Sequence, residues 1–118
     1  MNVKHPSRAP RCIALAACVL AASLSGHAAD GSAEQFAEGK KLFMQGAVPA
    51  CALCHTLKDA GSEGAVGPIL DELKPDASRV AKALRNGLGN MPAYKPTLSE
   101  AQILALAHYV AKASGGAQ

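Results

Sequence analysis

The sequence is poor in the large side chains from which a hydrophobic core is usually built. It contains no tryptophan, and its aromatic residues are two phenylalanines and two tyrosines. No segment has the pattern of a β-strand, which excludes the βαβ unit of thioredoxin-like proteins. A small chain with many alanines and so few aromatic residues is marginally stable unless another component helps to fill its core.

A hydrophobic run long enough to span a membrane is also missing. The apolar stretch at residues 12–24 is shorter than the ~20 residues that a spanning helix needs. It has the length expected in a secretory signal peptide, follows basic residues, and precedes Gly26-His27-Ala28, which has small residues at the −3 and −1 positions of a cleavage site. We therefore expect residues 1–28 to be a signal peptide cleaved after Ala28, and residues 29–118 to form one domain in a bacterial periplasm.

A second interpretation of the leader remains open. The segment Leu15-Ala16-Ala17-Cys18 resembles a lipoprotein box, in which case Cys18 would carry lipid and tether the protein to a membrane. Only the six residues 12–17 would then precede the cut, against the ~7–15 apolar residues of a typical signal peptide. We therefore expect membrane contact only if Cys18 is lipidated.

Outside the leader the chain has no excess of charge. Lys4, Arg8 and Arg11 account for three of the twelve basic residues, so nine remain against nine acidic residues. A neutral domain favours neither nucleic acid nor an anionic membrane as a partner. Two of the four cysteines, Cys12 and Cys18, also belong to the leader.

The most informative feature is the pentapeptide Cys51-Ala52-Leu53-Cys54-His55. C-x-x-C-H is the pattern for covalent attachment of a c-type haem. On a helical turn the two cysteines and the histidine lie on one face. Each thiol can form a thioether with a haem vinyl group, and His55 can supply the proximal nitrogen ligand to the iron. We therefore predict one haem c per chain, bound by Cys51, Cys54 and His55.

Other interpretations of this motif have less support. A zinc site would need a fourth ligand and usually a second ligand pair, and the sequence has no second C-x-x-C and no H-x-x-x-H. A redox-active dithiol would need the missing βαβ pattern. A disulfide between Cys51 and Cys54 and a chance match are the remaining alternatives.

Hydrophobic periodicity and capping residues predict three helices. Their expected ranges are residues 33–45, 76–86 and 100–112. The expected N-caps of the first and last are Ser32 and Ser99, each with a glutamine three residues later in a capping box. The predicted fold class is therefore all-α, and residues 114–117 are expected to be a frayed tail.

Gly39 lies inside the first predicted helix, where glycine costs up to ~1 kcal/mol relative to alanine. A close crossing of the first and last helices at Gly39 would explain its presence. Phe43 and Tyr109 would then fill the space on either side. The alternative is that the helix simply tolerates a weak helix former.

A six-coordinate haem iron needs a second axial ligand, for which we predict Met91. Two glycines precede Met91 and Pro92 follows it. The glycines allow a sharp backbone path toward a haem, and the proline fixes one side of the methionine. Met44 is interpreted as a packing residue and His108 as part of a solvated helix face, so these two residues and the lysines are weaker candidates.

The proximal histidine is expected to be held by a hydrogen bond from its second ring nitrogen. A backbone carbonyl is a common partner for a metal-bound histidine. The segment Gly67-Pro68-Ile69-Leu70 follows the attachment motif closely, and proline offers a carbonyl on a rigid turn. We predict that the Pro68 carbonyl accepts a hydrogen bond from His55; a plain turn is the alternative.

These segments together resemble the small monohaem class I cytochromes c of bacterial periplasms. The resemblance covers nearly all of residues 29–118 and is carried by the helix with Gly39, the attachment motif and residues 66–70, 90–92 and 106–110. It implies an all-α cytochrome c fold with helices packed around one haem, and His55 and Met91 as axial ligands. It further implies that Pro68 supports His55 and that Tyr109 and Phe43 pack near the haem and the helix crossing.

The resemblance implies electron transfer and no enzyme activity, because an iron with two axial ligands has no open site. The expected partners are a donor dehydrogenase and an acceptor cytochrome or oxidase, docked on a small apolar rim. The expected rim residues are Ala50, Ala52, Leu53, Ala93 and Tyr94.

The chain is also similar to cytochromes that accept electrons from sulfite-oxidising molybdoenzymes. The alternatives are a haem-bearing subunit bound tightly to a periplasmic dehydrogenase, such as a sulfite dehydrogenase, and an open-site haem sensor. A dihaem peroxidase would need a second C-x-x-C-H.

Overall fold

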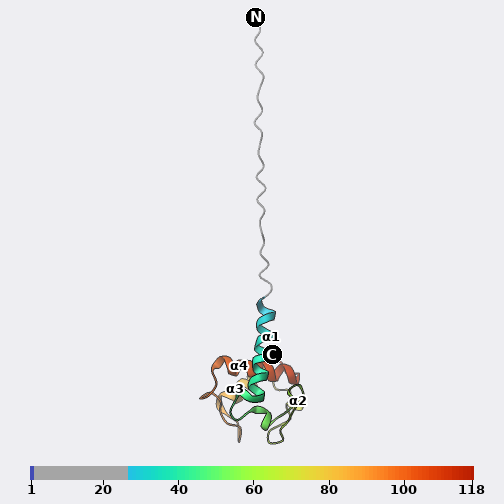
Figure 1. Cartoon of the computed structure of the whole chain (residues 1–118), viewed down its shortest axis with the longest axis vertical. Helices are drawn as coiled ribbons and strands as arrows, with labels where there is room; N and C mark the ends of the chain where they lie inside the picture. Colours follow the sequence, from blue (N-terminus) through green and yellow to red (C-terminus); the bar gives the residue numbers. More distant parts are fainter. Residues whose placement is uncertain (2–26) are drawn as a thin grey trace.

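The structure, a computed structural model, describes Met1 and residues 27–118 (Figure 1). Nearly all of the predicted leader, with the lipid site proposed at Cys18, lies outside the described residues. The α-helices within residues 27–118 are α1 (His27–Lys41), α2 (Leu70–Leu73), α3 (Ala77–Asn86) and α4 (Glu100–Ser114). Over this range no helix combines the length and the apolar character needed to cross a membrane.

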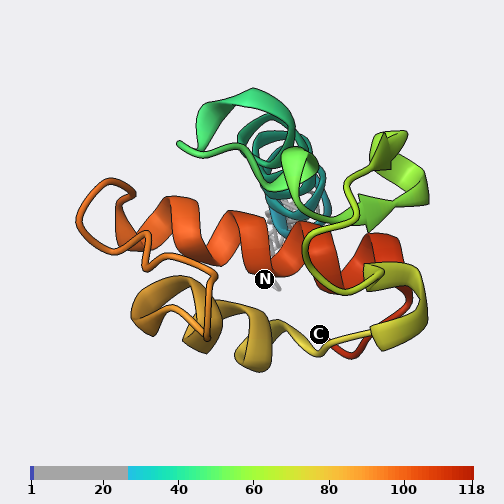
Figure 2. The ribbon, with the colours of Figure 1, turned by 90° about the horizontal axis from the view of Figure 1, so that it is seen from below.

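Helix α4 is the central element and packs against both α1 and α3 (Figure 2). It begins with the predicted capping box, in which Ser99 and Gln102 each bond the other's backbone N–H through their side chains. Ile103, Leu106, Ala107 and Val110, which follow the i, i+3, i+4, i+7 spacing of one helix face, are all buried. The periodicity of this segment therefore gave the correct core face.

The predicted crossing of α1 and α4 at Gly39 is confirmed. A Cβ atom on Gly39 would overlap the carbonyl oxygen of Ala105 and lie 2.5 Å from Cβ of Tyr109. Two phenylalanine rings pack edge-on against the fully buried Tyr109 ring, with centroid separations of 4.9 Å for Phe36 and 5.7 Å for Phe43. Glycine is present because any side chain would separate the two helix backbones.

The start and the end of α1 differ from the prediction. The helix begins at His27, so Ser32 is not its N-cap and lies within it. The Ser32 hydroxyl is instead 3.5 Å from Nε2 of His108 on α4. His108, which was expected on a solvated helix face, is half-buried. After Lys41 the chain continues as a π-helical turn, η1 (Leu42–Gly46), which buries Phe43.

The segment after η1 is irregular and contains two very short strands, although none was predicted. It includes the 3₁₀ turns η2 (Cys51–Leu53) and η3 (Lys58–Ala60). Strands β1 (Thr56–Leu57) and β2 (Ser62–Glu63) pair antiparallel, with Gly61 at φ 62° closing the turn between them. Strands of two residues are too short to produce an alternating pattern in the sequence.

The C-terminal residues pack against the domain, whereas a frayed tail was expected. Ser114 is buried, and Gly115 ends α4 in a left-handed conformation at φ 81°. The carbonyl of Ala117 then accepts a hydrogen bond of 2.9 Å from the N–H of Ala77. The tail thus provides a partner for a free N–H at the start of α3, where Asp76 also caps the helix. The predicted range of α3 is confirmed to within one residue.

Candidate functional site

A cavity of about 720 Å³ lies among η2, α3, α4 and the segment that carries Met91. Its volume falls within the ~300–1,000 Å³ typical of ligand and cofactor pockets. Most of its lining side chains are apolar, and they include Phe43 from the helix crossing and Leu84, Leu106 and Val110 from α3 and α4. The cavity therefore continues the hydrophobic core of the domain.

The attachment motif forms one tight turn at the edge of this cavity. The N–H groups of Cys54 and His55 both donate to the carbonyl of Cys51, at 3.1 and 3.0 Å. All three residues line the cavity, with Cys51 buried and Cys54 and His55 half-buried. The helical-turn geometry predicted for C-x-x-C-H is therefore present.

The His55 ring has the expected hydrogen bond to Pro68. Nδ1 lies 2.9 Å from the Pro68 carbonyl oxygen, which can only accept, so Nδ1 carries the proton. This leaves Nε2 with a free lone pair, the form in which a neutral imidazole binds a metal. The N–H of Gly67 donates to the carbonyl of Cys54 at 2.7 Å and holds the Pro68 turn against the motif.

Two glycines allow the chain to approach the attachment turn this closely. A Cβ on Gly67 would overlap Cε1 of His55 and lie 2.8 Å from its Nδ1. A Cβ on Gly64 would lie 2.5 Å from the backbone carbon of Cys54. Neither glycine was predicted to have this role, although their position shortly after the motif is a signal that could indicate it. The His55 ring is thus held in place by backbone on one side and lines the cavity.

Met91 also lines the cavity, at the end of a two-residue turn. Leu88 and Met91 exchange backbone hydrogen bonds of 3.0 Å in both directions. Gly87 and Gly89 have φ angles of 73° and 57°, which confirms the expected sharp path of the backbone. The rival ligand candidates Met44 and His108 do not belong to the cavity lining.

Tyr94 was expected on an exposed apolar rim, and this prediction is wrong. Its side chain is buried and lines the cavity, and its hydroxyl donates to the Pro49 carbonyl at 2.8 Å. Burial raises the pKa of Tyr94 to about 12, so the hydroxyl remains a proton donor at neutral pH. Leu53 and Ala93 are exposed as expected, and Ala50 and Ala52 are half-buried.

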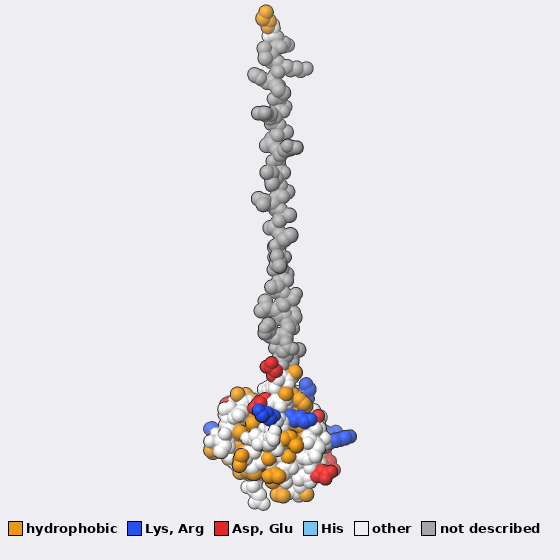
Figure 3. Space-filling model, in the orientation of Figure 1, with side chains coloured by type: hydrophobic (Ala, Val, Ile, Leu, Met, Phe, Trp, Pro, Cys, Tyr) orange, Lys and Arg blue, Asp and Glu red, His pale blue; other side chains and the backbone are white. Residues whose placement is uncertain are grey.

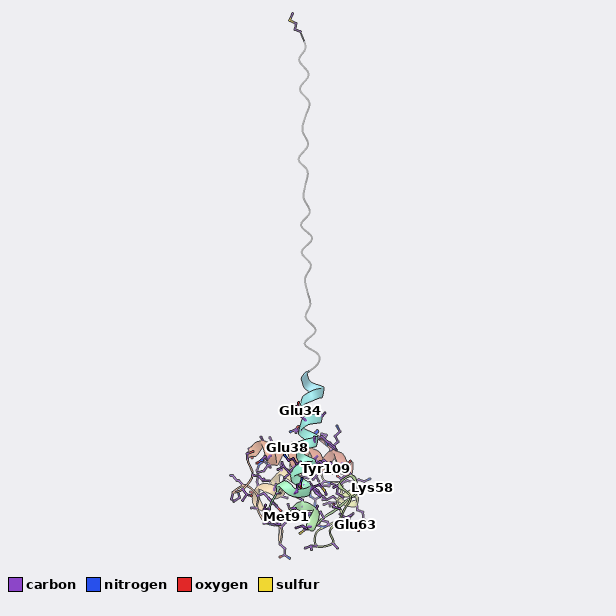
Figure 4. All side chains as sticks on the ribbon, in the orientation of Figure 1. Glu34, Glu38, Lys58, Glu63, Met91 and Tyr109 are labelled. Carbon is purple, nitrogen blue, oxygen red and sulfur yellow. The ribbon has the colours of Figure 1, made fainter. Side chains whose placement is uncertain are left out.

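Tyr109 was expected near both the cofactor and the helix crossing, and it does not line the cavity. It lies within the helix crossing, where its hydroxyl donates to Oδ1 of Asp59 at 2.8 Å. Figure 4 shows Tyr109 beside α1 and Met91 toward the lower edge of the domain. Phe43, which lines the cavity and packs against Tyr109, connects the two regions.

Basic side chains at the cavity were missed in the sequence. Arg79 and Lys82 on α3 belong to its lining, and both are exposed to solvent. They are three residues apart on one helix and therefore lie on the same face. This spacing was visible in the sequence, but only the packing of α3 shows that the face borders the cavity.

The Cys51 thiol does not have the lowered pKa that is typical of a reactive or zinc-bound cysteine. Burial raises the pKa of Cys51 to about 11, whereas reactive and metal-binding thiols have a lowered pKa. Cys51 and Cys54 are both free thiols here and form no disulfide. Within residues 27–118 no three His, Cys, Asp or Glu side chains are grouped so that they could hold a metal ion together.

Two comparisons with known proteins find similar chains. The family described as cytochrome c oxidase, cbb3-type, subunit III matches residues 34–110, which include every residue predicted to bind the cofactor. Among solved structures, the chain is similar to the crystal structure of the c-type cytochrome SorU from Sinorhizobium meliloti. The two share 49% sequence identity with a TM-score of 0.68, over 73% of this chain and 98% of that one. The curated proteins yield no significant match.

Proposed function

This chain belongs to the cytochrome c family, and from that premise we propose that it carries single electrons in a bacterial periplasm by means of one covalently bound haem. Its fold is the mostly helical class I cytochrome c fold that the sequence predicted. The observation that carries the proposal is the meeting of the attachment motif and Met91 in one apolar cavity. Bound there, a haem supplies a one-electron couple between ferric and ferrous iron.

Each of the lining residues has a proposed role toward the haem. Cys51 and Cys54 provide the two thioether sulfurs, and His55 and Met91 provide the axial ligands. The Pro68 carbonyl fixes the tautomer and orientation of His55, as its 2.9 Å hydrogen bond supports. Arg79 and Lys82 are the cavity's cationic side chains, and we propose that they pair with the haem propionates.

The surface around the cavity supports a small apolar docking site for redox partners. Three cavity-lining or motif residues are large, apolar and well exposed, namely Leu53, Val66 and Leu88. In Figure 3 the lower half of the face shown carries mainly hydrophobic and uncharged side chains, and charged ones lie above it and at its right edge. Met91 lies toward this lower half in the same orientation (Figure 4). Such contacts are typically small and transient.

We further propose that the electron donor is a sulfite-oxidising molybdoenzyme of the periplasm and that the acceptor is another cytochrome or an oxidase. The support is the resemblance of the sequence to cytochromes with such donors. The alternative, a fixed subunit of a dehydrogenase, would be seen in size-exclusion chromatography as co-elution of the native protein with the larger enzyme.

The attachment chemistry is tested on protein exported by a host that matures c-type cytochromes. After denaturation in acid and extraction with organic solvent, the red colour should stay with the wild-type polypeptide. It should leave the Cys51→Ser/Cys54→Ser double variant, while an exposed serine substitution such as Ala93→Ser should behave like the wild type. Colour that leaves the wild type would contradict covalent attachment.

The axial ligation is tested by spectroscopy of the same protein. The ferric wild type should show the weak near-infrared charge-transfer band of methionine–iron coordination, and the ferrous protein should resist carbon monoxide. Met91→Leu should abolish the band and allow rapid carbon monoxide binding, whereas Met44→Leu should change neither. If the wild type lacks the band and binds carbon monoxide at once, the open-site sensor is the better description.

A further inference from the structure

Tyr94 joins the two segments that bring the ligands to the cavity. Its hydroxyl donates to the carbonyl of Pro49, which directly precedes Ala50 and the attachment motif. Tyr94 follows Met91 by three residues in the sequence, and both residues line the same cavity. Among residues 27–118, this is the only hydrogen bond that connects residues 47–55 with residues 87–97.

The backbone of Tyr94 is fixed independently of this contact. Its N–H donates to the carbonyl of Leu84 in the last turn of α3, at 2.7 Å. Its carbonyl accepts from the N–H groups of Thr97 and Leu98, at 2.9 and 2.8 Å, in the turn that leads into α4. These bonds fix the Tyr94 backbone to α3 and to the turn before α4. The hydroxyl is therefore the group through which Tyr94 contacts the attachment segment.

Within residues 27–118, no second hydrogen bond holds the segment that carries Met91 to the attachment motif. It consists of a two-residue turn with glycines at positive φ on one side and Pro92 on the other, and it contains no helix. A methionine thioether is a neutral and weak ligand, so its bond to iron depends on how closely the backbone holds the sulfur in place.

We propose that Tyr94 is a positioning residue that latches the Met91 segment to the attachment segment and thereby keeps the methionine on the iron. This inference rests on the proposed function and adds to it the residue that sets how easily Met91 leaves. A phenylalanine would fill the same space in the core, so packing alone gives no reason for the hydroxyl.

Tyr109 provides a matched control for the loss of one buried hydroxyl. Its ring is also buried and its hydroxyl also makes a 2.8 Å hydrogen bond, but to Asp59 in the helix crossing and not at the cavity. Tyr109→Phe and Tyr94→Phe remove the same atom from the same domain. A purely structural role would make the two variants similar in every measurement.

The experiment compares the holoproteins of the wild type, Tyr94→Phe and Tyr109→Phe. All three should retain covalent haem and the near-infrared methionine band in buffer. In increasing guanidinium chloride, Tyr94→Phe should lose the band before its helical circular dichroism changes. Its ferrous form should bind carbon monoxide about tenfold faster than the wild type, the factor expected for one net hydrogen bond. Tyr109→Phe should lose the band and the helical signal together.

Two further results decide the proposal. Incorporation of p-aminophenylalanine at position 94, which keeps a donor at the ring's end, should restore the wild-type carbon monoxide rate. The latch is contradicted if Tyr94→Phe binds carbon monoxide at the wild-type rate, or if both phenylalanine variants change it equally. A wild type that lacks the methionine band would instead contradict the ligation by Met91, and with it the latch.

Discussion

The crossing of α1 with α4 and the cavity beside it are both lined mainly by apolar residues. They differ in what lies between the packed segments of each region. At the crossing, Gly39, Tyr109 and two phenylalanines pack directly against one another. At the cavity, apolar side chains from five separate segments surround about 720 Å³ that the chain itself does not fill. The comparison shows that the chain's own side chains fill one region, whereas the other encloses a volume large enough for the cofactor that we propose.

The two regions also differ in backbone. The crossing is formed by two helices of 15 residues each, whose hydrogen bonds are internal. The cavity is bounded largely by turns, held by isolated contacts such as those of His55 with Pro68 and Tyr94 with Pro49. A substitution at the crossing should therefore act on the whole fold, and one at the cavity should act first on the cofactor.

The largest effect is expected from Gly39→Leu. The side chain would overlap the backbone of Ala105 and force α1 and α4 apart, at a cost of about 3 kcal/mol or more in the free energy of unfolding. Holoprotein should accumulate poorly, which haem staining of periplasmic extracts would show. Glu38→Leu, at the exposed neighbouring position of the same helix, is the control. Equal stability of the two variants would mean that the crossing is not close-packed.

A smaller loss, specific to the cavity, is expected from Gly67→Ala. The methyl group would overlap the His55 ring and weaken its hydrogen bond to Pro68, at a cost of about 1–3 kcal/mol. Potentiometry should show a changed reduction potential, and denaturation of the holoprotein should show the loss of stability. In the control Gly61→Ala, the added atom meets nothing within 4 Å. That variant should have the wild-type potential, although its positive φ costs some stability.

A substitution on the exposed edge should change partner exchange and leave the fold intact. Leu53→Asp places a charge at the proposed docking rim, and it should slow electron exchange with a redox partner about tenfold. Stopped-flow mixing with the partner measures the rate, and the reduction potential should stay near the wild-type value. Leu104→Asp, at an exposed leucine of α4 that does not line the cavity, should leave the rate unchanged. An equal slowing by both variants would argue against a rim at Leu53.

The smallest effect is expected where Asp59 joins η3 to the crossing. Asp59 accepts hydrogen bonds from Lys40 and Tyr109, and the bond from Lys40 contributes most to lowering its pKa. Since the folded-state pKa is below that of the unfolded chain, the stabilisation is complete above the unfolded value and is lost as the pH falls through the folded one.

Asp59→Asn tests this contribution by urea titration at several pH values. The wild type should be more stable at neutral pH by up to about 1 kcal/mol, a small value because the ion pair is accessible to water. The difference should shrink below about pH 4, where the carboxyl group becomes protonated. A difference that stays constant down to pH 2 would show that ionised Asp59 does not stabilise the fold.

Local patterns predicted well wherever a single segment contains the whole signal. The capping box at Ser99, the range of α3 and the turn of the attachment motif all depend on residues close together in the sequence. The predictions failed where distant segments decide the outcome. Tyr94 was predicted to lie on the rim, but its hydrogen bond to Pro49 places it at the cavity. The tail after Ser114 was predicted to be frayed, but the Ala117 carbonyl accepts a hydrogen bond from Ala77.

The sequence by itself determined the family and predicted the haem site, because C-x-x-C-H places three functional groups within one turn of backbone and needs no distant contact. It also indicated Gly39 as a crossing point, because a glycine inside a helix requires a neighbour to explain it. Only the tertiary structure decided which aromatic residues face the cavity, which basic residues border it and how the Met91 segment is held. Those properties depend on the packing of segments that are distant in the sequence, as in the hydrogen bonds of Tyr94 with Pro49 and of Tyr109 with Asp59, and neither spacing nor periodicity encodes such contacts.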